Sequence, residues 1–100
     1  MPSNTTSRVF FYVYVLQSIK DSKYYIGYTA NLKRRLKEHE HGYNFSTEFR
    51  RPFILIYFEA CLSELDAKRR EHYLKTTQGR RFLGLRLIEY KRQPAFGTRS

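Results

Sequence analysis

Three segments of the chain are dominated by β-branched and aromatic residues, a composition typical of β-strands. The first segment, residues 9–17 (VFFYVYVLQ), is apolar at almost every position. A strand with two apolar faces is predicted to be central in a sheet that is covered on both sides. The other two are residues 24–28 (YYIGY) and 53–59 (FILIYFE). Asp21 and Ser22 predict a hairpin turn between the first two strands, which we therefore expect to be antiparallel.

Three segments with helical spacing follow the second and third strands. The first is expected to begin at about Asn31, with Thr29 or Asn31 as its cap, and to end near Gly42. The second is expected to begin after Ser63, and the third to cover about residues 80–90. The order β-β-α-β-α-α predicts an α+β fold, in which three helices flank a small three-stranded antiparallel sheet.

A chain of 100 residues without repeats or linkers is expected to form one domain. We expect a flexible N-terminus over residues 1–8, the folded domain over residues 9–90, and a flexible tail over residues 91–100. Cys61 is the single cysteine, so no disulfide can form within the chain, as is typical of cytosolic proteins. No signal peptide or membrane span is recognisable, so the expected location is the cytoplasm.

The charge balance points to a polyanionic partner. Lys and Arg total 19 and Asp and Glu total 9, which gives a net charge of +10. Nucleic acid is the simplest such partner, whereas a basic surface kept for solubility and an adaptor that binds protein are the alternatives. A membrane partner is not expected, because the basic helices lack a strongly apolar opposite face. The candidate nucleic-acid contacts are Lys33, Arg34, Lys37, Arg50, Arg51, Lys68 and Arg70.

Four polar side chains are candidates for one pocket. Arg35 and His39 lie four residues apart and border the apolar stripe of the first predicted helix, although such helices usually keep cations away from that stripe. Tyr14 and Tyr25 lie on adjacent predicted strands. Two hydroxyls, a guanidinium and an imidazole could therefore converge. Taken singly, each tyrosine also fits a half-buried packing role and Arg35 fits a solvated cation.

Glu71 is the candidate metal ligand. Its position along the stripe of Ala67 and Leu74 predicts a carboxylate beside the core, where a charge needs a partner. One interpretation is a bound metal ion. The other is an ion pair on the helix surface with Lys68 or Lys75, three residues before and four after, and spacing alone favours the ion pair.

The combined pattern resembles the GIY-YIG nuclease family. It is most similar to the small single-domain members related to the N-terminal nuclease domain found in the ABC excinuclease. The resemblance covers about residues 10–83, and Tyr12 stands where the family has the glycine of its first motif. The elements that carry it, in chain order, are Tyr12-Val13-Tyr14, Tyr25-Ile26-Gly27, Arg35, His39 and Arg70-Glu71.

The resemblance implies a three-stranded antiparallel sheet and a set of catalytic residues. Tyr14, Tyr25 and Arg35 would be catalytic, His39 would assist as a base or phosphate contact, and Glu71 would hold one Mg²⁺ or Mn²⁺ ion. The implied function is a Mg²⁺-dependent endonuclease for DNA, acting in repair or recombination. RNA as substrate stays open, as do a larger repair assembly and an additional DNA-binding partner. The alternative is a catalytically weak nucleic-acid-binding module of the same fold.

Overall fold

The computed structural model describes residues 8–42 and 51–93. It contains one antiparallel sheet with the strand order β2-β1-β3, so the predicted fold class is confirmed and the first strand is central as expected. The strands are β1 (Phe11–Ser18), β2 (Tyr24–Thr29) and β3 (Phe53–Cys61). The helices are α1 (Leu32–Glu40), α2 (Glu64–Leu74), α3 (Thr77–Arg86) and α4 (Ile88–Lys91).

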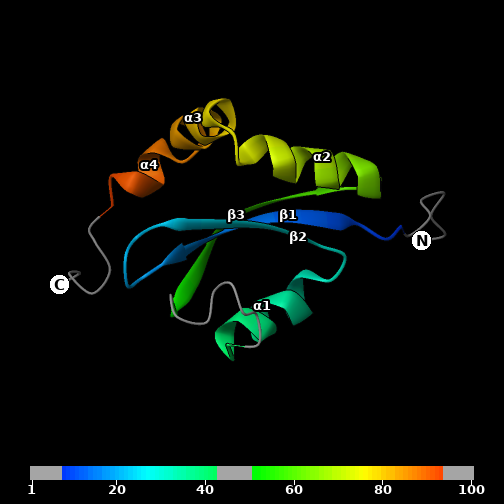
Figure 1. Ribbon diagram of the computed structural model, residues 1–100, viewed down its shortest axis with the longest axis horizontal. Coiled ribbons are helices and arrows are strands. Elements are labelled where there is room, and N and C mark those ends of the chain that lie inside the picture. Colours follow the sequence, from blue (N-terminus) through cyan, green and yellow to red (C-terminus); the bar gives the residue numbers. More distant parts are fainter. Residues whose placement is uncertain (1–7, 43–50, 94–100) are drawn as a thin grey trace, which may run out of the picture.

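The helices cover the two faces of the sheet separately. Figure 1 shows α1 beneath the sheet and α2, α3 and α4 above it. Side chains alternate between the faces of a strand, so the central strand β1 contributes to both layers. Val13 and Val15, which are 2% and 0% exposed, belong to the main core. The other buried members of this core are Ile26, Ala67, Leu74, Leu83 and Leu87.

The opposite face of β1 carries the candidate tyrosine. Tyr14 lies opposite Gly27 of β2 and Phe58 of β3, and Leu16 lies opposite Tyr25. The rings of Tyr14 and Tyr25 are therefore neighbours on the α1 face, with their centroids 6.4 Å apart. Strand register alone thus brings the two tyrosines together.

The predicted caps of the first two helices are confirmed. The Asn31 side chain accepts a hydrogen bond from the backbone N–H of Arg34 at 3.0 Å, which fixes the start of α1. The Ser63 hydroxyl accepts one from the backbone N–H of Asp66 at 3.3 Å at the start of α2. Each cap satisfies a backbone donor that the first turn of a helix leaves without a partner.

The predicted bounds of the last helix, residues 80–90, are wrong. The helix begins earlier because the Thr76 hydroxyl accepts a hydrogen bond from the backbone N–H of Gly79 at 3.1 Å. It ends earlier because Leu87, with φ −109° and ψ 25°, leaves the helical conformation while its side chain enters the core. The short helix α4 then continues to Lys91.

Most residues of the two predicted flexible ends lie outside the described part of the chain. Within residues 8–42 and 51–93, no helix is long and apolar enough to cross a membrane.

The predicted hairpin turn is confirmed, with Ser22 at a φ of 63° and the Ser18 N–H donating to the Lys23 carbonyl at 2.9 Å. This turn fixes the register between β1 and β2 and hence the placement of Tyr14 beside Gly27.

Candidate active site

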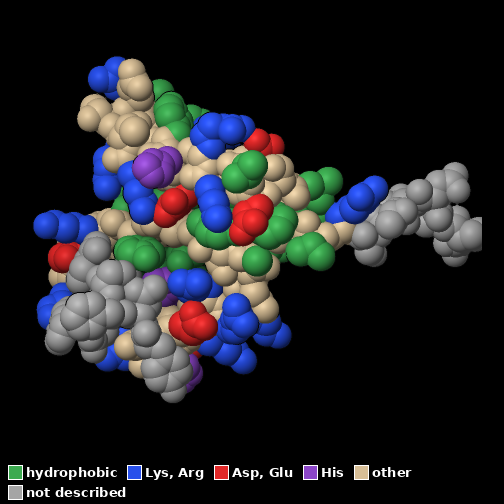
Figure 2. Space-filling model, turned by 45° about the vertical axis from the view of Figure 1, so that its right-hand side comes forward, with side chains coloured by type: hydrophobic (Ala, Val, Ile, Leu, Met, Phe, Trp, Pro, Cys, Tyr) green, Lys and Arg blue, Asp and Glu red, His purple; other side chains and the backbone are tan. Residues whose placement is uncertain are grey.

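A pocket of about 420 Å³ lies at the β2 edge of the sheet, between α1 and α2. Because the two helices lie on opposite faces of the sheet, the pocket draws residues from both layers. Figure 2 shows Lys and Arg side chains over the lower helix and over the upper ones, interspersed with acidic side chains and histidines. The residues that line the pocket are Tyr14, Tyr25, Gly27, Tyr28, Arg35, Lys68, Glu71 and His72.

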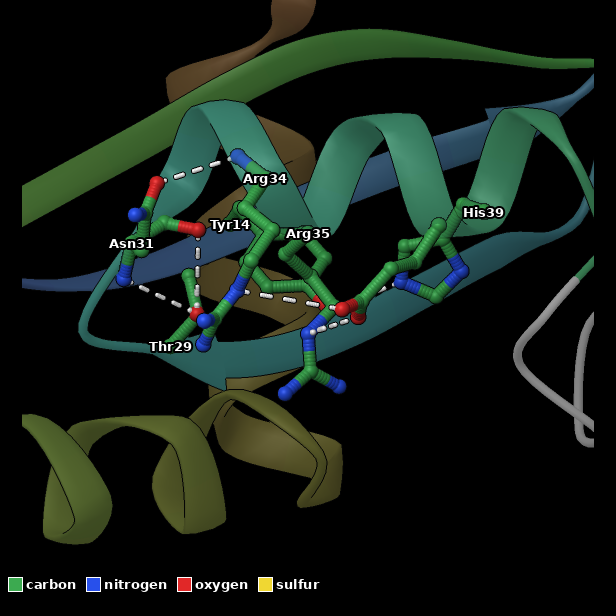
Figure 3. Close-up of polar contacts among 7 residues, drawn as sticks. Tyr14, Thr29, Asn31, Arg34, Arg35 and His39 are labelled. Carbon is green, nitrogen blue, oxygen red and sulfur yellow. Dashed lines mark hydrogen bonds and ion pairs between the residues drawn. The ribbon is translucent and has the colours of Figure 1, made fainter.

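Four of the five predicted site residues therefore line one pocket, and Tyr14 is the most buried of them. Its side chain is 1% exposed, and its hydroxyl is hydrogen-bonded to His39 Nε2 at 2.9 Å (Figure 3). Burial raises the pKa of Tyr14 and the neighbouring Tyr25 raises it further, while Arg35 lowers it. The balance is upward, so the Tyr14 hydroxyl is protonated at neutral pH.

His39 is the predicted site residue that does not line this pocket. It is 2% exposed and lies behind Tyr14, with its ring 5.1 Å from the Tyr25 ring and 6.2 Å from the Phe53 ring. Burial lowers the pKa of His39, and the charge of Arg35 lowers it further, so the imidazole is neutral at pH 7. The expectation that the His39 imidazole lines the pocket is therefore wrong, because His39 lies behind Tyr14 and contacts its hydroxyl.

Gly27 allows Tyr14 to take its position. A Cβ built at residue 27 would lie within 3.0 Å of three atoms of Tyr14, including the hydroxyl oxygen. The group that comes close to Gly27 is thus the ring of Tyr14. Real Cβ atoms almost never make such contacts, so glycine is required here for space.

Replacing Gly27 by alanine is expected to displace Tyr14, to destabilise the domain by about 1–3 kcal/mol and to reduce the activity of the site. Chemical denaturation of Gly27→Ala in wild-type and Tyr14→Ala backgrounds gives a double-mutant cycle. In the Tyr14→Ala background the penalty is expected to be much smaller, since the overlapping ring is gone. Equal penalties in both backgrounds would show that the ring is not what excludes a side chain at position 27.

Arg35 enters the pocket from α1 with its guanidinium held at one end. Its Nε lies 3.2 Å from Glu38 Oε1, and its side chain is 33% exposed. Figure 3 shows the two terminal nitrogens of Arg35 pointing away from this carboxylate, toward α2. Arg34 contacts the other oxygen of Glu38 at 3.8 Å but is 69% exposed and does not line the pocket.

Glu71 forms the ion pair that its spacing favoured, and it also lies at the wall of the pocket. Its carboxylate is 2.8 Å from Lys75 Nζ, four residues later, and its side chain is 20% exposed at the wall of the pocket. Among the described residues, no three His, Cys, Asp or Glu side chains form a group that could hold a metal. A single carboxylate fits Mg²⁺, which keeps several waters and takes further oxygens from a substrate phosphate. It does not fit a structural zinc site.

The sequence did not identify Tyr28 and His72 as site residues. The Tyr28 hydroxyl donates to Glu64 at 2.5 Å, and Lys68 Nζ lies 5.7 Å from the Tyr28 ring centroid. The hydrogen bond to Glu64 is the main cause that raises the pKa of Tyr28 to about 12. The signal for Tyr28 was available, since it lies on an edge strand on the face that α2 covers.

The cations predicted to contact nucleic acid fall into distinct settings. Lys33, Arg34 and Lys37 are exposed on α1, and Lys68 lines the pocket. Arg51 donates to the Glu40 carbonyl at 3.3 Å. Arg50 lies outside the described residues.

Arg70 is engaged in the fold. Its Nε and one terminal nitrogen donate to the two carboxylate oxygens of Glu59 at 2.9 and 3.0 Å, and its guanidinium lies 4.6 Å from the Phe82 ring centroid. Burial alone would raise the pKa of Glu59, but the hydrogen bonds from Arg70 and Tyr57 lower it. Because one bidentate edge of the guanidinium is used in this pair and the group lies over the Phe82 ring, Arg70 is better explained as a link between α2 and β3 than as a phosphate contact.

Comparison with known proteins extends this picture. The chain is 39% identical over 83 residues to a UPF0213 protein of Oceanobacillus iheyensis, covering 82% of this chain and 93% of that protein. It is 41% identical over 66 residues to a UPF0213 protein of Staphylococcus haemolyticus, covering 65% and 79%. The solution NMR structure of a UPF0213 protein from Bacillus halodurans is 33% identical, with a TM-score of 0.48 over 85% of this chain and 88% of that one.

A family model described as the GIY-YIG catalytic domain matches residues 10–83. This range contains every residue that lines the pocket, together with His39 behind Tyr14. The resemblance seen in the motifs is therefore confirmed, and the chain belongs to the GIY-YIG catalytic domain family, a nuclease-type family whose substrates are nucleic acids.

Proposed function

We propose that this protein is a Mg²⁺-dependent endonuclease that hydrolyses phosphodiester bonds in DNA. The observation that supports it best is the pocket in which Tyr14, Tyr25, Arg35 and Glu71 meet, with contributions from both layers of the fold. Phosphodiester hydrolysis needs a positioned water, stabilisation of the charge on the phosphoryl oxygens and help for the leaving group. The residue types in the pocket match these needs.

Arg35 is the group that contacts the scissile phosphate. Glu38 holds its Nε, so the two terminal nitrogens can donate to phosphoryl oxygens as a fork. This orientation exists before substrate binds, so little reorganisation is needed as charge develops in the transition state.

Tyr14 and His39 are the groups that handle the proton of the attacking water. A protonated tyrosine is a poor base by itself, but its hydroxyl proton can pass to the neutral imidazole at 2.9 Å as the Tyr14 oxygen takes a proton from water. Tyr25, whose ring packs against both Tyr14 and His39, orients this pair and the water. His39 thus assists as a base through Tyr14 and does not touch the phosphate.

Glu71 is the residue that would hold the metal ion. Its carboxylate faces the pocket and is paired with Lys75, which an incoming cation would displace. The chemistry that a bound Mg²⁺ supplies is neutralisation of charge on the phosphoryl oxygens and orientation of the substrate. Mn²⁺ accepts the same oxygen ligands.

Incubation of labelled DNA with the protein tests the proposal directly. We expect cleavage with Mg²⁺ and none with EDTA. Glu71→Gln should reduce cleavage by about 100-fold or more, because the amide cannot balance the charge of the ion. Glu89→Gln, at an exposed position on α4, is the matched control and should cleave like wild type. Tight binding without cleavage under any divalent ion would instead favour a binding module of the same fold.

DNA binding is expected to be electrostatic and to depend steeply on salt. The exposed cations of α1, together with Arg35, Lys68 and Arg51, provide about six phosphate contacts from a chain of net charge +10. Affinity should then fall by about 1,000-fold between roughly 50 and 200 mM salt, because the release of counterions from DNA contributes less to binding as the salt concentration rises. Fluorescence anisotropy over this range measures the slope, and a flat response would favour an adaptor that binds protein.

The partners of the domain and the type of its nucleic-acid substrate are also part of the proposal. A domain of 100 residues has little surface for sequence readout, so we infer that a separate DNA-binding partner or a larger assembly in repair or recombination directs it, in the cytoplasm. RNA is the competing substrate, because Arg35 and the exposed cations contact phosphates, which both nucleic acids share. Parallel cleavage assays on DNA and RNA of one sequence separate the two.

A further inference from the structure

Two aromatic rings on the α1 face of the sheet form a surface that is open to solvent. Phe58 of β3 is 49% exposed, and its ring centroid lies 6.0 Å from that of Tyr12 on β1. The register places Phe58 opposite Tyr14 and the small, exposed Ala60 opposite Tyr12. Tyr12, Phe58 and Ala60 therefore share one face, which we term the aromatic surface.

The aromatic surface is open because α1 packs on the other end of β3. The ring of His39 lies 6.2 Å from that of Phe53, and Leu36 lines a common cavity with Leu55. These contacts hold α1 over the first half of β3. The second half, which carries Phe58, is left without a covering helix among the described residues.

Two lysines of α1 lie on the flank of the helix that faces β3. Lys37 lines a cavity together with Phe53 and Leu55 of β3, which identifies that flank. Lys33 is four residues earlier and therefore on the same flank, one turn closer to the end of the sheet that carries Tyr12. Both lysines lie about 200° around the helix from Arg35, which faces the pocket. Positive charge thus borders the aromatic surface.

We propose that the aromatic surface binds unpaired bases of a nucleic-acid strand, by stacking on Phe58 and Tyr12 while Lys33 contacts the phosphates. Every base offers a π-face for such stacking, and cations beside aromatic rings are the usual design of single-strand sites. A second copy of the chain fits less well, because two surfaces of a protein with net charge +10 repel each other.

The position of the surface suits a substrate that is also held in the active site. β3 is two strands away from β2, or about 10 Å at the usual spacing between strands. A nucleic-acid strand advances about 3.4 Å per nucleotide, so roughly three nucleotides separate the two sites. This inference rests on the proposed function and deepens it, since it selects substrates with an unpaired strand beside the cleavage point.

The first test compares binding of a single-stranded oligothymidylate and a duplex of equal length to the full chain in EDTA. Phe58→Ala should weaken single-strand binding by about ten-fold and change duplex binding less than two-fold. Leu85→Ala, which removes a 69% exposed side chain from α3, is the matched control and should change neither. Equal loss on both ligands, or no loss, would overturn the proposal.

A second variant provides a reporter of stacking. The chain has no tryptophan, so Phe58→Trp introduces a single indole at the aromatic surface. Its fluorescence should be quenched by the oligothymidylate and not by heparin, a polyanion without bases. Quenching by both would show that the surface binds through charge alone and would overturn the proposal. A wild-type dimer that Phe58→Ala converts to a monomer would show instead that the surface is an interface between copies of the chain. Neither readout involves cleavage, so failure here is distinguishable from failure of the nuclease proposal.

Discussion

Replacing Arg35 by alanine is expected to slow DNA cleavage by about 100- to 1,000-fold while DNA binding weakens only modestly. The many other cations hold the DNA backbone, so one lost charge removes one contact among several. The transition state is more sensitive, because Arg35 is the arginine whose terminal nitrogens face the pocket in the described part of the chain. Removing one such preorganised donor has an effect of this size in other enzymes.

Arg34→Ala is the internal control for this experiment. Arg34 is 69% exposed and lies outside the pocket. It contacts a different oxygen of Glu38 from the one that Arg35 contacts, so its loss leaves the Arg35–Glu38 pair intact. Single-turnover cleavage and anisotropy should show normal chemistry and slightly weaker binding. Arg35→Lys should restore little, since an ammonium cannot reproduce the fork of a guanidinium. If both alanine variants lost cleavage in proportion to binding, Arg35 would be one more backbone contact.

Replacing Gly79 by alanine is expected to destabilise the domain by about 3 kcal/mol or more. A Cβ at this position would lie closer than 3.0 Å to the carbonyl oxygen of Tyr73 and to Cα of Leu74. Both atoms belong to the backbone at the end of α2, so the clash cannot be relieved by a side-chain rotation. The two helices would have to separate at the point where Leu74 and Leu83 enter the core.

Gly84→Ala supplies the matched control within the same helix. Among the residues that the structure describes, a Cβ at residue 84 would meet only Lys91 Nζ, at 3.4 Å, which is an ordinary contact with a flexible side chain. Alanine is the better helix former, so this variant should gain about 0.5–1 kcal/mol. Urea denaturation of the two variants measures the contrast, and similar stabilities for both would show that α2 and α3 do not require the close approach at Gly79.

The elements that the sequence predicted well are those governed by local rules. The run of residues 9–17 with two apolar faces indicated a central strand, and β1 is central. Asn31 and Ser63 indicated helix starts, because a cap depends on residues only three positions apart. Tyr14 and Tyr25 were placed together because the short hairpin determines their register.

The features that escaped prediction depend on partners that are distant in the chain. Arg70 was expected to contact nucleic acid, but Glu59, 11 residues earlier on another element, engages it. The ring that excludes a side chain at position 27 belongs to Tyr14, 13 positions away, and His39 is buried behind that ring. The break at Leu87 follows from the need to place its side chain in the core, which no local signal in the sequence indicates.

The pocket takes Arg35 from the layer beneath the sheet and Glu71 from the layer above it. The distance between these two groups therefore measures how each helix sits on the shared edge strand β2. A substitution that repacks the core could move α2 by about 1 Å, leave the melting temperature unchanged and still slow turnover about 100-fold. Engineering of this protein for heat resistance should accordingly be screened by rate, because thermal stability does not report the alignment of its two layers.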